Sequence, residues 1–215
     1  NGIKLAGAEH ILKQLLEELP VPVQTTWKTI DMMDEEDRLY AGHPGAMGDR
    51  GANLILQSAD LLISVGSRLD TSLTAFNEKN FAKSAKKVIV DIDENELKRM
   101  KVEQVEDKVI GDAGDFLDKL LSAVKRENWD VQVREWDLWL EECHKVRQKY
   151  PVVTEEHRKV KDKVSAYYFI DRLCNQLTEH DVVVPESSGA AGEITYQAFQ
   201  LKYGQKMKNA AGLGS

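Results

Sequence analysis

The chain has 215 residues, of which 42% are hydrophobic and 30% charged, as is usual for a globular protein. Its net charge of −7 provides no general attraction to nucleic acid, and no apolar run approaches the ~20 residues that a membrane helix needs. The cysteines Cys143 and Cys174 lie far apart without metal or redox spacing, which is typical of unpaired thiols in a reducing compartment. We therefore expect a cytoplasmic protein that binds neither nucleic acid nor a membrane.

The amino-terminal segment predicts a helix followed by a strand. Apolar residues recur at helical spacing over residues 6–19, and Pro20 would end this helix. Residues 21–26 then have the composition of a strand, with Pro22 near its start, where a missing amide donor is tolerated.

Two short apolar runs, residues 61–65 and 88–92, predict buried parallel strands. Helices are expected beside them at residues 51–58, 73–85 and 93–100, and a further short strand at 109–110. This alternation of helices and strands with short loops predicts an α/β fold, a doubly wound parallel sheet of Rossmann-like topology.

Polar residues follow the predicted strands at their carboxyl ends, which is the edge of an open α/β sheet where ligands bind. The first strand leads into Gly66, Ser67, Arg68 and Asp70, and the second delivers Asp91. A glycine there lets the backbone approach a phosphate, and an acid about 20 residues further on can accept from a ribose hydroxyl. The same residues also suit a turn, a surface ion pair and a helix cap, so the pattern alone leaves both interpretations open.

Four glycines recur at every third position from Gly42 to Gly51, just before an apolar helical pattern. Exposed amides at a helix start can hold an anion. The spacing matches neither the GxGxxG of a dinucleotide site nor a GKS/T phosphate loop, so a glycine-rich turn without a catalytic role is favoured. His43 is interpreted as a loop residue rather than a base or a metal ligand.

The next segments predict helices with structural roles. Asp93 and Glu96 have the spacing of a capping box, so Asp93 is expected to cap a helix. Aromatic and apolar residues between Trp129 and Val146 lie at helical intervals, which is more typical of core packing than of a cofactor box. A strongly charged stretch follows, so residues 127–163 are interpreted as a helix and an interdomain linker.

A second α/β unit is expected from residue 164 onward. Ser165 can cap its first helix, and the strand at residues 181–185 is followed by a small-residue loop, a helix at 194–201 and a strand from 206. We expect a central domain at residues 1–126, the linker at 127–163 and an incomplete second unit at 164–215. This unit is too short to close a core of its own, and the chain is expected to be a piece of a larger polypeptide.

Several linked motifs resemble one family. GHPGAMGDRGAN, SADLLISVGSRLD, KKVIVDIDENEL and VIGDA follow in the order found in the central domain of thiamine-diphosphate-dependent enzymes, of the acetolactate synthase large-subunit type. The opening NGIKLAGAEHILKQLLEELPVPVQTTW resembles the start of that domain, and SAYYFIDRLCNQLTEHDVVVPESSG with AAGLGS resembles the start of the diphosphate-binding domain.

The resemblance implies a transferase or lyase of three α/β domains, working as a homo-oligomer, that decarboxylates a 2-oxo acid and often transfers the acyl group to a second carbonyl. Its cofactors would be thiamine diphosphate and Mg²⁺. The family's activating glutamate and its GDG…NN magnesium motif have no match within residues 1–215, so the missing domains of the same polypeptide are the expected partners. We expect no catalytic or metal-binding residue in this chain, no cofactor binding by it at the thiamine site, and no activity from it alone.

The family's central domain binds FAD in some members, which gives a possible flavin or nucleotide site in this chain: Gly66, Ser67, Arg68, Asp70, Asp91, Ile92, Glu96, Gly111 and Asp112. The resemblance also gives a loop that touches the diphosphate in relatives: Ser187, Ser188, Gly189 and Ala190. Two departures affect the flavin site, since Met47 replaces a histidine of acetolactate synthases and Asp70-Thr71-Ser72 replaces an arginine-containing segment.

Two functions of different classes therefore stay open. The chain is either a non-catalytic central module of a thiamine enzyme, or a module that binds FAD or a nucleotide by itself. An autonomous sirtuin-like enzyme is disfavoured because no histidine of the chain lies in a matching motif.

Overall fold

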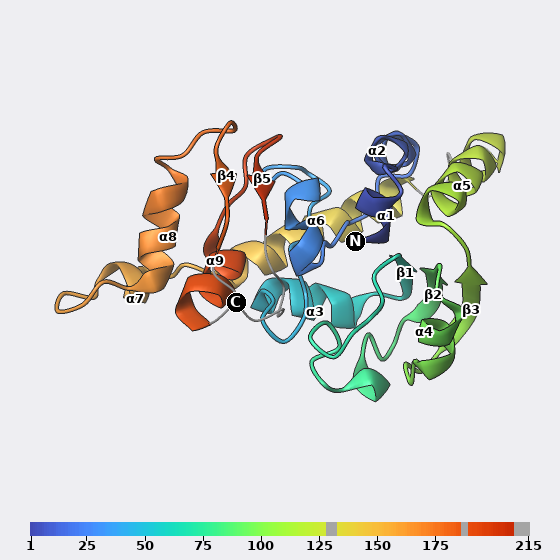
Figure 1. Ribbon diagram of the computed structural model, residues 1–215, viewed down its shortest axis with the longest axis horizontal. Coiled ribbons are helices and arrows are strands. Elements are labelled where there is room, and N and C mark those ends of the chain that lie inside the picture. Colours follow the sequence, from blue (N-terminus) through green and yellow to red (C-terminus); the bar gives the residue numbers. More distant parts are fainter. Residues whose placement is uncertain (128–132, 186–188, 209–215) are drawn as a thin grey trace.

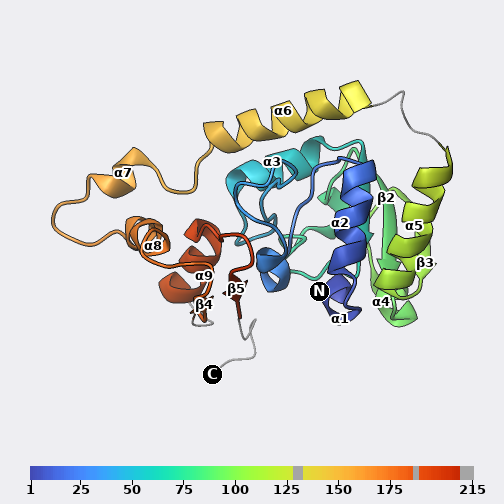
Figure 2. The same ribbon diagram turned by 90° about the horizontal axis from the view of Figure 1, so that it is seen from above.

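The computed structural model describes residues 1–127, 133–185 and 189–208, with the side chains of residues 133–134 and 189–191 left aside. Within these residues the chain forms two α/β units that lie at opposite ends of the molecule, with the long helix α6 running alongside (Figure 2). None of the helices among them is long and apolar enough to cross a membrane.

A three-stranded parallel sheet forms the centre of the first unit. Its strands are β1 (Leu61–Val65), β2 (Lys86–Asp91) and β3 (Val105–Ile110), in the spatial order β1-β2-β3. β1 pairs with β2 in one register from Leu61 opposite Lys86 to Val65 opposite Val90, whereas the pairing of β2 with β3 contains one irregularity after Lys87. The chain is therefore α/β with Rossmann-like topology, as the sequence predicts.

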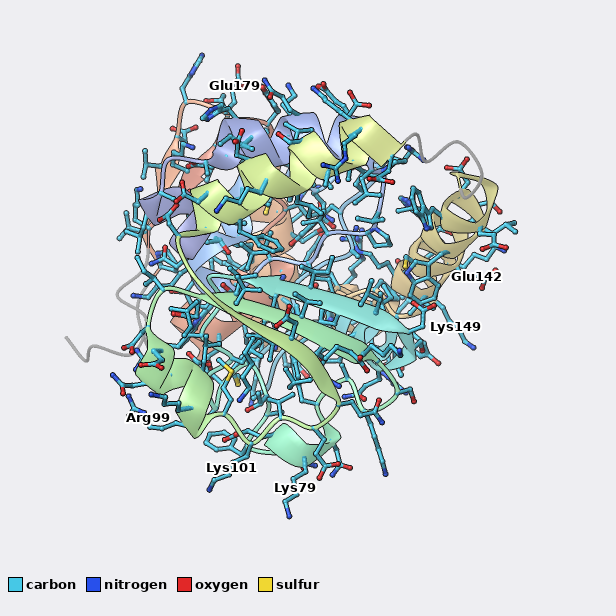
Figure 3. The ribbon with its side chains drawn as sticks, turned by 90° about the vertical axis from the view of Figure 1, so that its right-hand side faces the viewer. Lys79, Arg99, Lys101, Glu142, Lys149 and Glu179 are labelled. Atoms are coloured by element: carbon cyan, nitrogen blue, oxygen red, sulfur yellow. The ribbon has the colours of Figure 1, made fainter. Side chains whose placement is uncertain are left out.

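Helices cover both faces of this sheet (Figure 1). On one face α2 (Glu9–Glu18) lies beside α5 (Ala113–Glu127), through Leu15, Leu117 and Leu121; Figure 3 shows these blue and yellow-green helices together above the sheet. The short helix α1 (Gly2–Leu5) precedes them. On the other face α4 (Glu94–Arg99) packs against β2 through Leu97 and Ile89. The labelled charged side chains in Figure 3 point outward, as expected for the solvated side of such a layer.

The helix before β1 connects the sheet to the linker. α3 (Arg50–Ser58) buries Leu56 toward the sheet and Ile55 toward α6 (Val133–Lys149), where Ile55 meets Cys143 and Trp139. The described part of the predicted stripe, Trp139, Cys143 and Val146, is thus core packing, as the sequence indicates, whereas Trp129 lies outside the described residues.

The second unit contains α8 (Ala166–Cys174), β4 (Val182–Val183), α9 (Gly189–Ala198) and β5 (Lys206–Met207), with β4 parallel to β5, and the short helix α7 (Glu155–Arg158) precedes it in the linker. Its small core is completed by residues from outside the unit. Ser165 caps α8 by accepting from the amide of Tyr168. The 3₁₀ helix η1 (Trp27–Met32) of the first unit inserts Ile30 into this core beside Tyr196 and Phe199. Asp31 then accepts from Lys4 at 2.5 Å and from the amide of Met207 at 3.4 Å, so η1 joins the two units.

The prediction of a helix at residues 73–85 is wrong. The segment folds into turns with only a short 3₁₀ helix η2 (Glu78–Asn80). The Asp70 carboxylate accepts from the amide of Leu73, the Thr74 hydroxyl donates to the Asp70 carbonyl, and Asn80 donates to the side chain of Asn77. Such side-chain bonds to nearby polar groups compete with helix formation.

Three smaller expectations also need correction. Residues 21–26 make a single parallel bridge between Val23 and Tyr40 rather than a strand, because Pro20 and Pro22 lack amide donors. α9 runs from Gly189 to Ala198 instead of from residue 194 to residue 201. Asp93 does cap α4 by accepting from the amide of Asn95, but the Glu96 carboxylate binds arginines instead of closing a capping box.

The backbone of the amino-terminal residues packs directly against the backbone at the carboxyl end of β1. The Gly2 amide donates to the Gly66 carbonyl at 2.8 Å, and a Cβ on Gly66 would lie 2.6 Å from the Gly2 Cα. Gly66 has a φ of +58°, which disfavours any other residue. This glycine is therefore required by chain packing and turn geometry, independently of any ligand.

We expect Gly66→Ala to lower the free energy of unfolding by about 1–3 kcal/mol, because the new methyl group meets backbone and the conformation is strained. Urea denaturation measures the change. Gly111→Ala is the matched control at the end of β3, since no atom lies within 4 Å of its added Cβ, and its effect should stay within about 0.5 kcal/mol. Equal effects at the two positions would contradict this account of Gly66.

Candidate functional site

The glycine-rich loop, residues 42–49, closes on itself. The Asn53 side chain accepts from the Gly45 amide at 2.9 Å and donates to the Gly45 carbonyl at 3.0 Å. The Asp49 amide donates to the His43 carbonyl, and the Ala46 amide donates to the Ser72 carbonyl. The amides of Gly45, Ala46 and Asp49 are therefore used for closure of the loop, as in the glycine-rich turn that the sequence favours.

Loop closure buries an imidazole against a carboxylate. His43 is only 5% exposed, and its Nδ1 lies 3.3 Å from Asp49 Oδ2 without the alignment of a hydrogen bond. Burial, assisted by the Arg147 guanidinium, lowers the pKa of His43 to about 4, and burial raises the pKa of Asp49 to about 7. Burial therefore disfavours the charged form of both side chains.

Arg147 on α6 contacts several polar groups close to His43 and Asp49. Its guanidinium donates to the Tyr40 carbonyl at 3.1 Å, pairs with Glu35, and lies 4.9 Å from the centre of the Tyr40 ring. Burial raises the pKa of Glu35 although Arg147 opposes the shift. These residues, with His43 and Asp49, line a polar cavity of about 360 Å³.

A second cavity of about 390 Å³ lies at the carboxyl end of β1, and we name it the β1-edge pocket. Four of the sequence-predicted residues line it: Gly66, Ser67, Arg68 and Asp70. The glycine-rich loop contributes Met47, and η1 contributes Trp27 and Lys28. Its position matches the edge of a parallel sheet where ligands bind, and its size falls in the range of about 300–1,000 Å³ typical of ligand sites.

The other predicted residues lie beside the pocket rather than in its wall. Asp91 is buried and accepts from the amide of Asp93 at 2.9 Å, whereas Ile92 is 72% exposed. Glu96 binds Arg68 at 3.0 Å and Arg99 at 2.9 Å, which links α4 to the pocket wall.

The last two predicted site residues, Gly111 and Asp112, directly follow β3. The Gly111 amide donates to the Asp91 carbonyl, and Asp112 accepts from the amides of Gly114 and Asp115 at the start of α5. These bonds give each residue a structural role at the same sheet edge. A ligand role for them stays a prediction.

Sequence reasoning missed several residues of the pocket wall, among them Trp27, Lys28, His43 and Tyr196. Trp27 and Lys28 lie on η1, and Tyr196 lies on α9 of the second unit. No local pattern marks them, and Tyr196 reaches the pocket through the packing of the second unit against η1. His43 was correctly placed in a loop, but its burial follows from loop closure.

The predicted diphosphate loop lies at the margin of the described residues. Ser187 and Ser188 fall outside them, and Gly189 and Ala190 are described only as the first residues of α9. Within residues 1–127, 133–185 and 189–208, no three His, Cys, Asp or Glu side chains gather as a metal site would require.

Comparison with known proteins identifies related chains. Residues 1–120 match the family described as thiamine pyrophosphate enzyme, central domain. The chain is 30% identical over 152 residues to the acetolactate synthase large subunit of Cyanidium caldarium, covering 71% of this chain and 26% of that protein. It is 28% identical over 220 residues to the acetolactate synthase large subunit of Corynebacterium glutamicum, covering 100% of this chain and 33% of that protein.

A third relative gives a similar alignment. The chain is 27% identical over 221 residues to the probable acetolactate synthase large subunit of Methanocaldococcus jannaschii, covering 100% of this chain and 36% of that protein. The chain thus spans between 26% and 36% of the length of these three relatives.

The buried Asp49 carboxyl predicts a pH dependence of stability. Its pKa of about 7 in the folded state exceeds the ordinary value of 3.8, so the folded chain binds more protons than the unfolded chain between these pH values. Asp49 ionisation therefore makes the free energy of unfolding fall as the pH rises through this window. Asp49→Asn removes this contribution, so the variant should gain stability relative to wild type from pH 4 to pH 8.

Urea denaturation at several pH values measures this difference. Asp118→Asn, on the exposed face of α5, is the control for the change in net charge. Parallel pH profiles of wild type and Asp49→Asn would show that the carboxyl is not buried in the way described.

Proposed function

The chain belongs to the thiamine pyrophosphate enzymes, and from this premise we propose that it is the central part of an enzyme of acetolactate synthase type. One observation carries the proposal. The alignment with the Corynebacterium glutamicum large subunit covers 100% of this chain, so the similarity continues beyond the central-domain match at residues 1–120 into the linker and the second unit.

The proposed reaction of the whole enzyme is the decarboxylation of a 2-oxo acid, with transfer of the acyl group to a second carbonyl. Thiamine diphosphate, bound with Mg²⁺, supplies the electron sink for the loss of CO₂. We assign no catalytic step to the described residues of this chain.

The role proposed for this chain is to hold other parts of the enzyme in place. We propose a central domain at residues 1–126, a linker at 127–163 and part of a diphosphate-binding unit at 164–215. The core shared by Ile30 of η1 and Phe199 of the second unit supports this role, because it holds the two units together. A cytoplasmic homo-oligomer is proposed for the whole enzyme on the strength of the family resemblance.

The experiment is to express the complete reading frame that encodes this chain, beside residues 1–215 alone, and to measure CO₂ release from pyruvate and other 2-oxo acids. We expect the complete protein to be active only with thiamine diphosphate and Mg²⁺, and residues 1–215 alone to be inactive. An inactive complete protein on every 2-oxo acid tried would contradict the proposed reaction, and turnover by residues 1–215 would contradict the proposed division of roles.

A second candidate function is favoured by the β1-edge pocket. It lies at the ligand-binding edge of a Rossmann-like sheet and combines aromatic, apolar and charged residues, as organic ligand sites do. We propose that it binds FAD or a related nucleotide, with Arg68 near the phosphates. This role is compatible with the first, because it adds a ligand to the central domain without adding catalysis.

Calorimetric titration of the chain with FAD tests the second candidate. We expect saturable binding, weakened about tenfold or more by Arg68→Ala, since a charge-assisted hydrogen bond contributes roughly 1.5–3 kcal/mol. Arg99→Ala is the matched control, because Arg99 binds the same Glu96 oxygen as Arg68 but does not line the pocket. Equal losses in the two variants would assign the effect to Glu96 and α4 rather than to a phosphate contact.

A further inference from the structure

The polar cavity of about 360 Å³ has buried polar atoms in its wall that find no hydrogen-bond partner among the described residues. They are both ring nitrogens of His43, which is 5% exposed, and Oδ1 of Asp49. Buried polar groups of native proteins nearly always have a partner, in the protein, in water or in a ligand. A partner that the described residues do not provide is therefore expected in this cavity.

The charged side chains of the described wall leave one carboxyl without a counterion. Arg147 pairs with Glu35, and Arg158 Nη2 lies 3.6 Å from Asp171 Oδ2. Asp49 is the remaining carboxyl, and no lysine or arginine of the described residues pairs with it. Burial raises its pKa to about 7 although Arg147 opposes the shift, so a proton takes the place of the missing cation. A ligand with one positive charge would balance this carboxylate.

Two helices end at the same cavity. α6 ends at Lys149, and its neighbours Gln148 and Tyr150 line the wall. α9 ends at Ala198, which lines the wall itself. The carboxyl end of a helix carries partial negative charge, which favours a cation nearby. The backbone therefore points to the same sign of ligand charge as Asp49.

Another part of the wall is apolar. Ile30, Phe199 and Leu201 belong to the core of the second unit, and Val152 packs against this core. A short alkyl chain can be buried against these side chains. The cavity is also far larger than the ~30 Å³ that one water molecule occupies, and its volume falls within the range of organic ligand sites. Its size and its apolar wall favour an organic ligand over a bare ion.

We propose that the polar cavity binds a primary alkylamine in its ammonium form, with the ammonium group donating to Asp49 Oδ1 and to a ring nitrogen of His43, and with the alkyl chain against the apolar wall. His43 is the only residue that lines both this cavity and the β1-edge pocket within the described chain. The proposal does not depend on the nucleotide candidate.

The wall comes from three parts of the chain. The first unit contributes Asp49, α6 contributes Arg147, and the second unit contributes Phe199. An amine that binds where these parts meet stabilises their packing, because it binds only the assembled wall. We therefore expect saturating amine to raise the melting temperature of the chain.

Calorimetric titration of the chain with n-butylammonium, in a buffer free of amines, tests the proposal. Methylammonium, 1-butanol and K⁺ are the comparison probes. We expect n-butylammonium to bind about tenfold or more tightly than methylammonium, because it buries three further methylene groups. 1-Butanol has the chain without the charge and K⁺ has the charge without the chain, so both should bind more weakly than n-butylammonium.

The variant Asp49→Asn identifies the carboxyl that receives the ammonium group. It should weaken n-butylammonium binding about tenfold or more, because a charge-assisted hydrogen bond is lost. Asp118→Asn, on the exposed face of α5, removes the same charge outside the cavity and should leave the affinity unchanged.

The pH profile of the affinity gives a second readout. Between pH 5 and pH 6 the ammonium group must displace the Asp49 proton, so the affinity of wild type should rise about tenfold and level off above pH 7. The other charged groups of the wall, Glu35, Arg147, Arg158 and Asp171, are present in wild type and in Asp49→Asn alike. The difference between the two profiles therefore reports Asp49, and Asp49→Asn should lack this rise.

The outcomes separate this inference from the functions proposed above. Equal affinity of wild type and Asp49→Asn, or parallel pH profiles, overturns the role of Asp49. Equal affinity for 1-butanol or for K⁺ overturns recognition of an alkylammonium ion, and binding of none of the probes overturns the site itself. The FAD titration and the CO₂ assay of the complete protein decide the two proposed functions independently of each of these results.

Discussion

Closure of the glycine-rich loop is the constraint on which the candidate site depends. The paired bonds between Asn53 and Gly45 fix the middle of the loop against α3, and Gly48 has no room for a side chain because a Cβ would lie 2.4 Å from the His43 carbonyl oxygen. These contacts stabilise the observed conformation of the loop, which places His43 in the wall of both cavities. Its glycines are required by the backbone conformation of the loop, and a ligand would contact the surface that this conformation forms.

The two buried side chains of this loop, His43 and Asp49, change the stability of the fold in opposite directions as the pH rises. The lowered pKa of His43 makes stability rise with pH between about 4 and the ordinary value of 6.5, because the unfolded chain binds the extra proton there. The raised pKa of Asp49 makes stability fall over nearly the same window. The two ionisations oppose each other, so the loop keeps its stability across mildly acidic and neutral pH while both side chains remain close to neutral.

Local sequence predicts those parts of the fold that local forces determine. β1 was expected at residues 61–65 and occurs there, and Asp93 and Ser165 cap the helices they were expected to cap. The segment after Asp70 was misread, because its apolar spacing was weighed without the bonds that Asp70, Thr74 and Asn77 make to neighbouring groups. Four residues of the candidate site were found at the end of β1, whereas Tyr196 was not, since its position depends on how a segment 130 residues further on packs against η1.

The structural and ligand-binding roles of this chain depend on the same contacts. η1 contributes Ile30 to the core of the second unit and Trp27 to the β1-edge pocket, and α9 contributes Phe199 to that core and Tyr196 to the pocket. A ligand that binds only the docked arrangement must stabilise docking by the same free energy that docking adds to its affinity. On the proposed function, occupancy of this pocket would hold a diphosphate-binding unit against the central domain. A bound nucleotide could then act in such an enzyme as a structural ligand, without taking part in the reaction.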